Sequence, residues 1–182
     1  MKKALLWTPL PEKAVQCQLC AHRCIIKNGE MGICHVRENI SGTLFSHTYN
    51  KLIAAHIDPI EKKPLFHFLP GSLSYSVATP GCNFTCLHCQ NASISQMPRE
   101  LGVIKGESVS PDNIVKNALS HHCKSVSYTY TEPTIFFEYA YETAVVAREK
   151  GIKNVFVTNG FMTSEAIEKL APVLDAANID LK

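Results

Sequence analysis

The second part of the chain alternates between short apolar runs and longer segments whose apolar residues recur at helical spacing. The runs that read as strands are Tyr75–Thr79, Ser125–Thr129, Lys153–Thr158 and Asn178–Leu181. The helical segments run from Ser110 to about His122, from Pro133 to Lys150, and from Thr163 to about Asp175 with a break near Pro172. Ser110-Pro111-Asp112 has the residue types that begin helices, and Gly151 is a typical stop. The repeated strand-helix order predicts a parallel α/β sheet or barrel.

The first part of the chain has a different pattern. Residues Thr43–Tyr49 and Leu52–Ile57 read as two strands, and Asn50-Lys51 between them predicts a hairpin. The run Ile57–Ser72 contains three prolines and predicts a stiff, extended connector. Within it, the charged pair Lys62-Lys63, together with His67, is interpreted as a solvated face. We therefore expect a small module and connector over residues 1–74, followed by a core over residues 75–182.

Composition narrows the class of protein. Of the 182 residues, 46% are hydrophobic and 19% are charged, which excludes a disordered or collagen-like chain. The net charge of +2 gives no field that would hold a polyanion, so no nucleic-acid partner is expected. The apolar run Ala4–Trp7 is too short for an export signal, and no stretch reaches the roughly 18 apolar residues of a membrane span. We expect a cytoplasmic protein without a membrane segment.

Seven of the eight cysteines fall into two groups. The second group, Cys82, Cys86 and Cys89, directly follows the strand-like run Tyr75–Thr79, and active sites of parallel α/β folds lie at this end of the strands. Three thiolates cannot pair off as disulfides. A [4Fe-4S] cluster held by three cysteines keeps one iron open for chemistry. The alternative is a zinc site completed by His88 or by a distant residue.

The first group has four potential ligands, enough to close a metal site. Its members are Cys17, Cys20, Cys24 and Cys34. A structural zinc ion and an auxiliary iron-sulfur cluster both fit this spacing, with His22 and His35 as possible substitute ligands. The eighth cysteine, Cys123, stands alone and is interpreted as a buried free thiol.

The residues Gly81–Asn91, GCNFTCLHCQN, resemble the cluster loop of the radical S-adenosylmethionine (SAM) enzymes. Thr131-Glu132-Pro133-Thr134 resembles the GGEP element of that superfamily, although the same residues also suit the acidic first turn of a helix. Thr158-Asn159-Gly160 resembles the TNG turn of pyruvate formate-lyase activating enzymes and also suits an ordinary turn after a strand. Asp180-Leu181-Lys182 resembles the DLK element of the same enzymes. Together with Ile57–Ser72 and the first cysteine group, the whole chain resembles the radical SAM enzyme of the AmmeMemoRadiSam grouping.

This resemblance implies an oxidoreductase in which Cys82, Cys86 and Cys89 bind a [4Fe-4S] cluster and SAM chelates its fourth iron. Reduction would cleave SAM to methionine and a 5′-deoxyadenosyl radical, which abstracts hydrogen from a substrate. The implied cofactor-binding residues are Thr131, Glu132, Asn159, Gly160 and Asp180. The implied partners are SAM, an electron donor such as ferredoxin or flavodoxin, and a protein substrate that carries a glycine, as in glycyl-radical activation.

The resemblance also implies a partial barrel of about six strand-helix units. Four strands and three helices account for only its first part, so we expect a radical SAM core truncated after the fourth strand, preceded by the cysteine-rich module. Judged from the residues alone, a non-enzymatic function is an alternative. The two cysteine groups would also suit a non-enzymatic iron-sulfur electron carrier or a zinc-stabilised interaction module.

Overall fold

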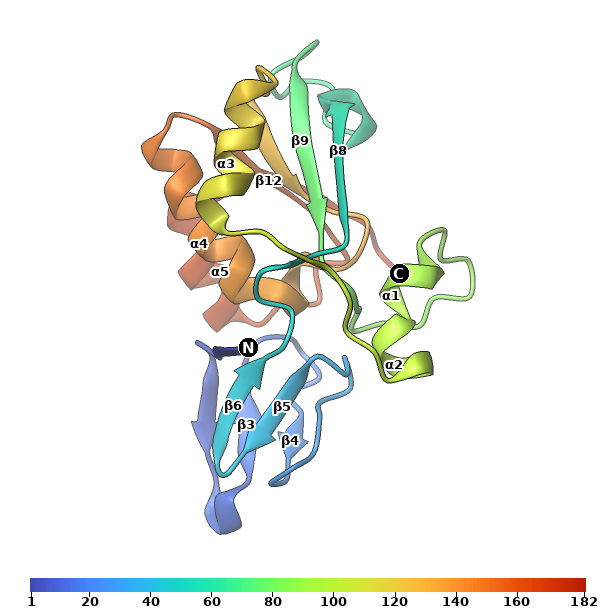
Figure 1. Cartoon of the computed structure of the whole chain (residues 1–182), viewed down its shortest axis with the longest axis vertical. Helices are drawn as coiled ribbons and strands as arrows, with labels where there is room; N and C mark the ends of the chain where they lie inside the picture. The colour runs from blue at the N-terminus through green and yellow to red at the C-terminus, as the bar shows by residue number, and fades with distance from the viewer.

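The computed structural model describes residues 1–182 and is built around one five-stranded sheet (Figure 1). In spatial order the strands are β13 (Ala176–Ile179), β12 (Lys153–Thr158), β11 (Ser125–Tyr128), β9 (Leu73–Ala78) and β8 (Ala54–Pro59). Strands β9, β11, β12 and β13 are parallel, and β8 pairs antiparallel with β9 at one edge. The parallel α/β prediction is confirmed. The sheet is open, with β13 and β8 at its edges, and does not close into a barrel.

Helices cover one face of this sheet (Figure 1). They are α3 (Pro111–Ser120), α4 (Phe137–Glu149), which continues the 3-10 turn η3 (Pro133–Phe136), and α5 (Ser164–Leu170), followed by the 3-10 turn η4 (Ala171–Val173). Ser110 and Thr163 cap α3 and α5, because their hydroxyls accept hydrogen bonds from the main-chain N–H groups of Asn113 and Ala166 at 3.3 and 3.2 Å. Fully buried aromatic side chains fill the space between helices and sheet: Tyr128, Phe136, Phe137 and Phe156.

Two predicted elements differ in detail. The segment expected as one helix from Pro133 begins as a 3-10 turn, because the Glu132 carboxylate accepts the Thr134 N–H and shapes the first turn. The last strand ends at Ile179 instead of Leu181, since Ile179 is the partner of Thr158 at the end of β12. Asp180 therefore follows the strand.

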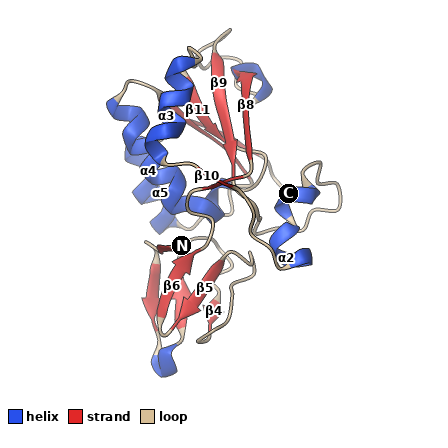
Figure 2. Ribbon diagram, viewed as in Figure 1, coloured by secondary structure: helices blue, strands red, loops and turns tan.

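The N-terminal part forms two small antiparallel sheets, which stand together at one end of the molecule (Figure 2). One contains β1 (Lys2–Lys3), β6 (Thr43–Ser46) and β5 (Arg37–Ile40), and the other contains β2 (Trp7–Pro9), β3 (Val15–Cys17) and β4 (Ile25–Ile26), with the 3-10 turn η1 (Pro11–Lys13) between β2 and β3. Their apolar side chains join the main hydrophobic core, as Val15, Leu44 and Val36 are fully buried in it.

The predicted hairpin between Thr43–Tyr49 and Leu52–Ile57 is wrong. Strand β6 pairs with β5 across Ser41-Gly42, whose positive φ angles of 53° and 86° suit a tight two-residue hairpin turn. The next residues split between β7 (Lys51–Leu52), which pairs with β10 (Glu107–Ser108), and β8, which joins the main sheet. The Ser41-Gly42 turn upstream pairs β6 with β5, so β6 does not form a hairpin across Asn50-Lys51.

The extended connector expected over Ile57–Ser72 is also only partly correct. Its first residues belong to β8, and the 3-10 turn η2 (Ile60–Lys62) follows directly. The expected division at residues 74 and 75 thus falls inside β9, next to β8 in the same sheet. After β9, the cysteine loop leads into the short helices α1 (Ala92–Ser95) and α2 (Met97–Leu101). No helix in the structure combines the length and apolar character that crossing a membrane demands.

Candidate functional site

The loop that carries Cys82, Cys86 and Cys89 begins where β9 ends. Gly81 makes this turn possible: its φ is +105°, and a Cβ there would lie 2.8 Å from Val36 Cγ1. All three thiols are free of disulfides. Two of the sulfurs already face donors from the chain, since Phe84 N lies 3.5 Å from Cys82 Sγ and Ser95 Oγ lies 3.4 Å from Cys89 Sγ.

The three cysteines line one cavity of about 730 Å³ at the carboxyl ends of the parallel strands. Every parallel strand contributes to its wall, through the cysteine loop after β9, the residues after β11, the end of β12, and the residues after β13. Four of the five residues expected to bind the cofactor line the cavity, namely Thr131, Glu132, Asn159 and Asp180. Gly160 is next to Asn159 in the chain but is not part of the wall. The topology thus brings together residues that are up to 98 positions apart, from Cys82 to Asp180.

Glu132, at the wall of this cavity, links the end of β11 to the end of β12 by hydrogen bonds. It is 3% exposed, and its carboxylate accepts hydrogen bonds from Thr158 Oγ1 at 2.6 Å, from Asn159 N at 2.8 Å, and from Thr134 Oγ1 and N at 2.5 and 3.0 Å. Burial raises the pKa of Glu132, while these hydrogen bonds favour the charged form and oppose the shift. Four donors occupy the lone-pair sites of one carboxylate. Its side chain therefore organises the strand ends.

The main-chain carbonyl groups of residues 130–132 differ in whether they accept a hydrogen bond from the chain. Tyr130 O accepts the Asn91 side-chain N–H at 2.8 Å, and Glu132 O accepts Ile135 N at 3.2 Å. Between them, Thr131 donates its hydroxyl to Thr79 O at 2.8 Å, but its own carbonyl accepts no hydrogen bond from the chain. Thr131 is 7% exposed and belongs to the cavity wall, and a carbonyl in such a buried residue ordinarily has a partner.

Asn159 and Gly160 form the turn after β12. The Asn159 side chain donates to Asn83 Oδ1 at 2.8 Å and accepts from Phe161 N at 3.0 Å. Gly160 has a φ of +69°, and a Cβ there would stand 2.7 Å from Ile179 Cγ2, so this position requires glycine. The turn is thereby locked both to the cysteine loop and to β13.

A buried ion pair that sequence reasoning missed lies beside the same cavity. Lys63 is 2% exposed, and its Nζ lies 2.7 Å from Asp58 Oδ2, which contradicts the expected solvated face at Lys62-Lys63. Lys62 is the exposed member of the pair and bonds Asp58 Oδ1 at 2.8 Å. The Tyr130 hydroxyl also donates to Asp58. Both lysines and Tyr130 line the 730 Å³ cavity. The hydrophobic pattern of the sequence does not predict that Lys63 is buried. Lys63 follows the 3-10 turn after β8, so its place depends on the pairing of β8 with β9.

The charge state of Asp58 follows from these contacts. Burial alone would raise its pKa, but hydrogen bonds from Lys62, Lys63 and Tyr130 outweigh burial and hold the pKa well below its ordinary value of 3.8. Burial lowers the pKa of Lys63, and its contact with Asp58 opposes that shift. Asp58 is therefore held in its charged form beside the cavity, and the exposed Lys62 adds a second lysine to the cavity wall.

The first cysteine group lies beneath the cysteine loop of the main site. Cys17, Cys20, Cys24 and Cys34 line one small cavity together with Asn83. His22, expected as a substitute ligand, directs Nε2 to the carbonyl of Asn83 at 3.0 Å, and His35 is not part of this wall. The lone Cys123 is buried and free, as expected.

Burial also affects the pKa values of the cysteine thiols. It raises the pKa of Cys20 to about 11, of Cys34 to about 12 and of Cys82 to about 11. No three or more histidine, cysteine, aspartate or glutamate side chains surround one point as the ligands of a single metal ion would.

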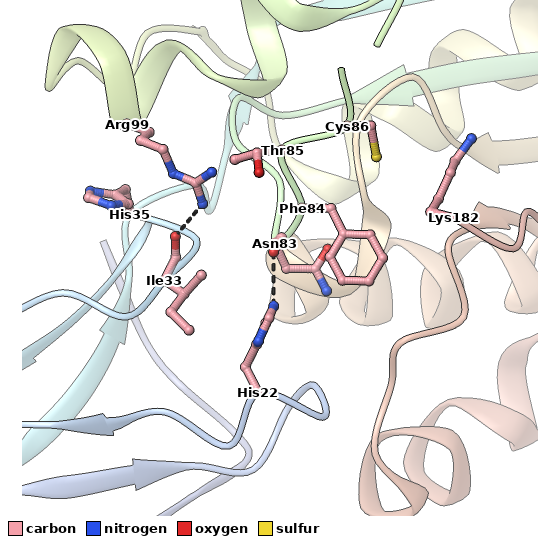
Figure 3. A pocket seen from close by; sticks show the side chains of 9 residues that line it. All are labelled: His22, Ile33, His35, Asn83, Phe84, Thr85, Cys86, Arg99 and Lys182. Carbon is pink, nitrogen blue, oxygen red and sulfur yellow. Dashed lines mark hydrogen bonds between the residues drawn. The ribbon is translucent and has the colours of Figure 1, made fainter. Parts of the chain in front are cut away.

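A second, open groove of about 540 Å³ runs between the N-terminal part and the cysteine loop (Figure 3). Its walls include Phe84, Cys86 and Lys182 on one side and His22 on the other, joined by the His22–Asn83 hydrogen bond. Arg99 closes one end by donating to Ile33 O at 2.7 Å. Because Cys86 and Lys182 belong to both walls, the groove leads to the cysteine cavity.

Comparison with known proteins places these residues in a family context. The model of the radical SAM superfamily matches residues 76–182, which include the cysteine loop and all four parallel strand ends. The uncharacterized protein MJ0808 of Methanocaldococcus jannaschii is 48% identical over 182 residues, which cover 100% of this chain and 54% of that protein. The uncharacterized protein MJ0674 of the same organism is 26% identical over 171 residues, covering 91% of this chain and 45% of that protein. The chain thus spans about half the length of the curated relatives it matches.

Proposed function

Because the chain belongs to the radical SAM superfamily, we propose that it holds a [4Fe-4S] cluster on Cys82, Cys86 and Cys89 and binds SAM in the adjoining cavity. The observation that carries this proposal is that three cysteines and the ends of all four parallel strands share one cavity. Cys82, Cys86 and Cys89 would hold the cluster, which, once reduced by an external donor, would supply the one electron for cleavage of SAM to methionine and a 5′-deoxyadenosyl radical that abstracts hydrogen from the substrate. The residues of this chain bind and orient the reactants.

The donor set suits such a cluster. Three thiols cannot close a four-ligand site, and each bonds a different iron in a cubane, so they need not converge on one point. The N–H of Phe84 and the hydroxyl of Ser95 face two of the sulfurs and would stabilise their thiolate forms. The cavity volume of about 730 Å³ lies within the roughly 300–1,000 Å³ of small-molecule sites.

The polar groups of the cavity suit the charges of SAM. The carbonyl of Thr131 would accept a hydrogen bond from the amino group of SAM, with Glu132 holding that segment in place. Lys62 and Lys63 supply positive charge for the carboxylate. Asn159, held through the Gly160 turn, and Asp180 would contact the remaining polar atoms of the nucleoside.

We further propose a substrate and an electron source. The open groove beside Cys86 gives a polypeptide loop access to the cavity, which supports a protein glycine as the hydrogen donor. A glycine, the residue that would lose hydrogen, has no side chain that the groove would have to accommodate. A one-electron donor of the ferredoxin or flavodoxin class would reduce the cluster.

Reductive cleavage of SAM tests the proposed chemistry directly. The chain is reconstituted anaerobically with iron and sulfide, reduced with dithionite in the presence of SAM, and assayed for 5′-deoxyadenosine by mass spectrometry. Wild type and Cys123→Ala are expected to form 5′-deoxyadenosine, and Cys86→Ala is expected to form none. A Cys86→Ala variant that keeps full iron, sulfide and SAM cleavage would refute the assignment.

Isotope transfer tests the substrate. Extract from cells grown on α-deuterated glycine is separated into macromolecules and small molecules, and each fraction is added to the reduced enzyme with SAM. Deuterium in 5′-deoxyadenosine from the macromolecular fraction is the expected result. Deuterium that arrives only from the small-molecule fraction, or from neither, contradicts a protein glycine.

A further inference from the structure

We propose that Cys17, Cys20, Cys24 and Cys34 bind a second iron-sulfur cluster, separate from the one on the main cysteine loop. Cys17 ends β3, Cys20 and Cys24 follow in the next loop, and Cys34 lies between β4 and β5. The fold brings all four to the wall of one cavity. This inference concerns a different set of residues and does not depend on the proposed function.

The same cavity has two buried N–H donors without partners. Asn83 is 2% exposed, and because its Oδ1 accepts from Asn159, its Nδ2 is the atom left unpaired. Arg37 is also 2% exposed, and it uses Nη1 and Nη2 to hold Glu138 at 3.0 and 2.7 Å, so Nε stays unpaired. Both residues belong to the cavity wall. Buried donors require acceptors, and thiolates or the sulfides of a cluster supply them.

The donor groups favour a cluster over one zinc ion. No three of the cysteine side chains, alone or with a histidine or an acidic side chain, are placed to hold a single ion. In a [4Fe-4S] cluster each cysteine binds its own iron, and the inorganic sulfides add acceptors for buried N–H donors such as Asn83 Nδ2 and Arg37 Nε.

The position of Asn83 connects this site with the main one. It follows Cys82 directly, accepts from Asn159 at the main cavity, and turns its free N–H toward the first cysteine group. Its carbonyl bonds His22, which belongs to the N-terminal part. The two proposed clusters therefore lie on either side of one residue.

Metal analysis of a triple variant tests the inference. The full chain with Cys82→Ala, Cys86→Ala and Cys89→Ala is reconstituted anaerobically beside wild type, and iron, acid-labile sulfide and zinc are measured per chain. We expect about eight irons in wild type and about four in the triple variant. Cys20→Ser with Cys34→Ser should remove about four irons from wild type, and Cys123→Ser should remove none. A triple variant without iron, or with one zinc per chain, overturns the inference.

The Asn83 donor gives a second readout that does not depend on removing ligands. In the triple variant, Asn83→Leu deletes the N–H while keeping a similar size, and loss of a hydrogen bond to sulfur lowers the reduction potential of a cluster. We expect a lower midpoint potential in a spectroscopic redox titration. An unchanged potential overturns the assignment of Asn83 to this site. A wild-type chain that cleaves SAM with only four irons would overturn this inference and leave the proposed function standing.

Discussion

The side-chain amide of Asn159 donates a hydrogen bond of 2.8 Å to the side-chain oxygen of Asn83. This contact joins the turn after β12 to the loop that carries the three cysteines. Since the main-chain N–H of Asn159 also bonds Glu132, three strand ends are fixed relative to one another by hydrogen bonds. The relative position of the cysteine loop and the cavity wall depends on this small network.

Asn159→Ala is expected to weaken SAM binding about tenfold, which corresponds to about 1.4 kcal/mol, the scale of one lost polar contact. The cysteine loop would lose its link to the turn, and the buried Asn83 would lose a partner. Equilibrium dialysis with the reconstituted protein measures the affinity. Asn117→Ala is the matched control, because Asn117 is also half-buried but bonds Tyr75 on another part of the sheet. Equal affinities for the two variants would contradict this role.

Glu132→Gln should lower the free energy of unfolding by about 2–4 kcal/mol. The carboxylate is buried and accepts four hydrogen bonds, and the amide nitrogen would face N–H and O–H donors that it cannot satisfy. Denaturant unfolding of both proteins measures the difference. Glu168→Gln, at an exposed position of α5, is expected to stay within about 0.5 kcal/mol of wild type. A similar small effect at Glu132 would show that its network contributes little.

Much of this architecture follows from local signals. The strand Lys153–Thr158, the start of α3 after Ser110 and the cysteine loop after β9 are where the sequence predicts them, because each depends on residues close in the chain. The grouping of Glu132, Asn159 and Asp180 follows from a further rule, since parallel strands end at one edge of a sheet.

Features that depend on distant pairing could not be predicted in this way. The sequence of β8 does not indicate that it pairs with β9, so it predicts a solvated face at Lys63, whereas Lys63 is buried with Asp58 beside the cavity. The predicted hairpin across Asn50-Lys51 is wrong for the same reason, because β6 pairs with β5 and β8 pairs with β9. The hydrogen bonds of Glu132 also depend on where Thr158 and Asn159 lie in space, which its own neighbours in the chain do not specify.

Gly160→Ala should destabilise the fold more than Gly151→Ala. Both glycines have a positive φ, +69° and +72°, so both variants introduce backbone strain of about 1 kcal/mol. Only at Gly160 would the new Cβ meet another atom, Ile179 Cγ2 at 2.7 Å, whereas nothing lies within 4 Å at Gly151. Thermal unfolding compares the two. Adding Ile179→Ala should recover part of the loss in Gly160→Ala, and the absence of any recovery would contradict the steric explanation.

Asp58→Asn is expected to cost about 3 kcal/mol near neutral pH, because Lys63 would stay buried without its counter-charge. The folded-state pKa of Asp58 is lowered, so its stabilisation is present above the ordinary value of 3.8 and is lost as the pH falls through the folded-state pKa. The difference in unfolding free energy between wild type and Asp58→Asn should therefore be constant from about pH 7 to about pH 5 and shrink below about pH 4. A difference that grows with acidity would have the wrong sign.

The proposed open iron on the main cysteine loop is tested most directly by electron-nuclear double resonance on the reduced protein with SAM labelled with nitrogen-15 and oxygen-17 in its amino acid part. The triple Cys17→Ser, Cys20→Ser and Cys34→Ser background leaves only the cluster on Cys82, Cys86 and Cys89 in the sample. We predict hyperfine coupling of both labels to that cluster, and no coupling from equally labelled methionine offered alone. A fully loaded cluster that shows no coupling to labelled SAM would contradict the account.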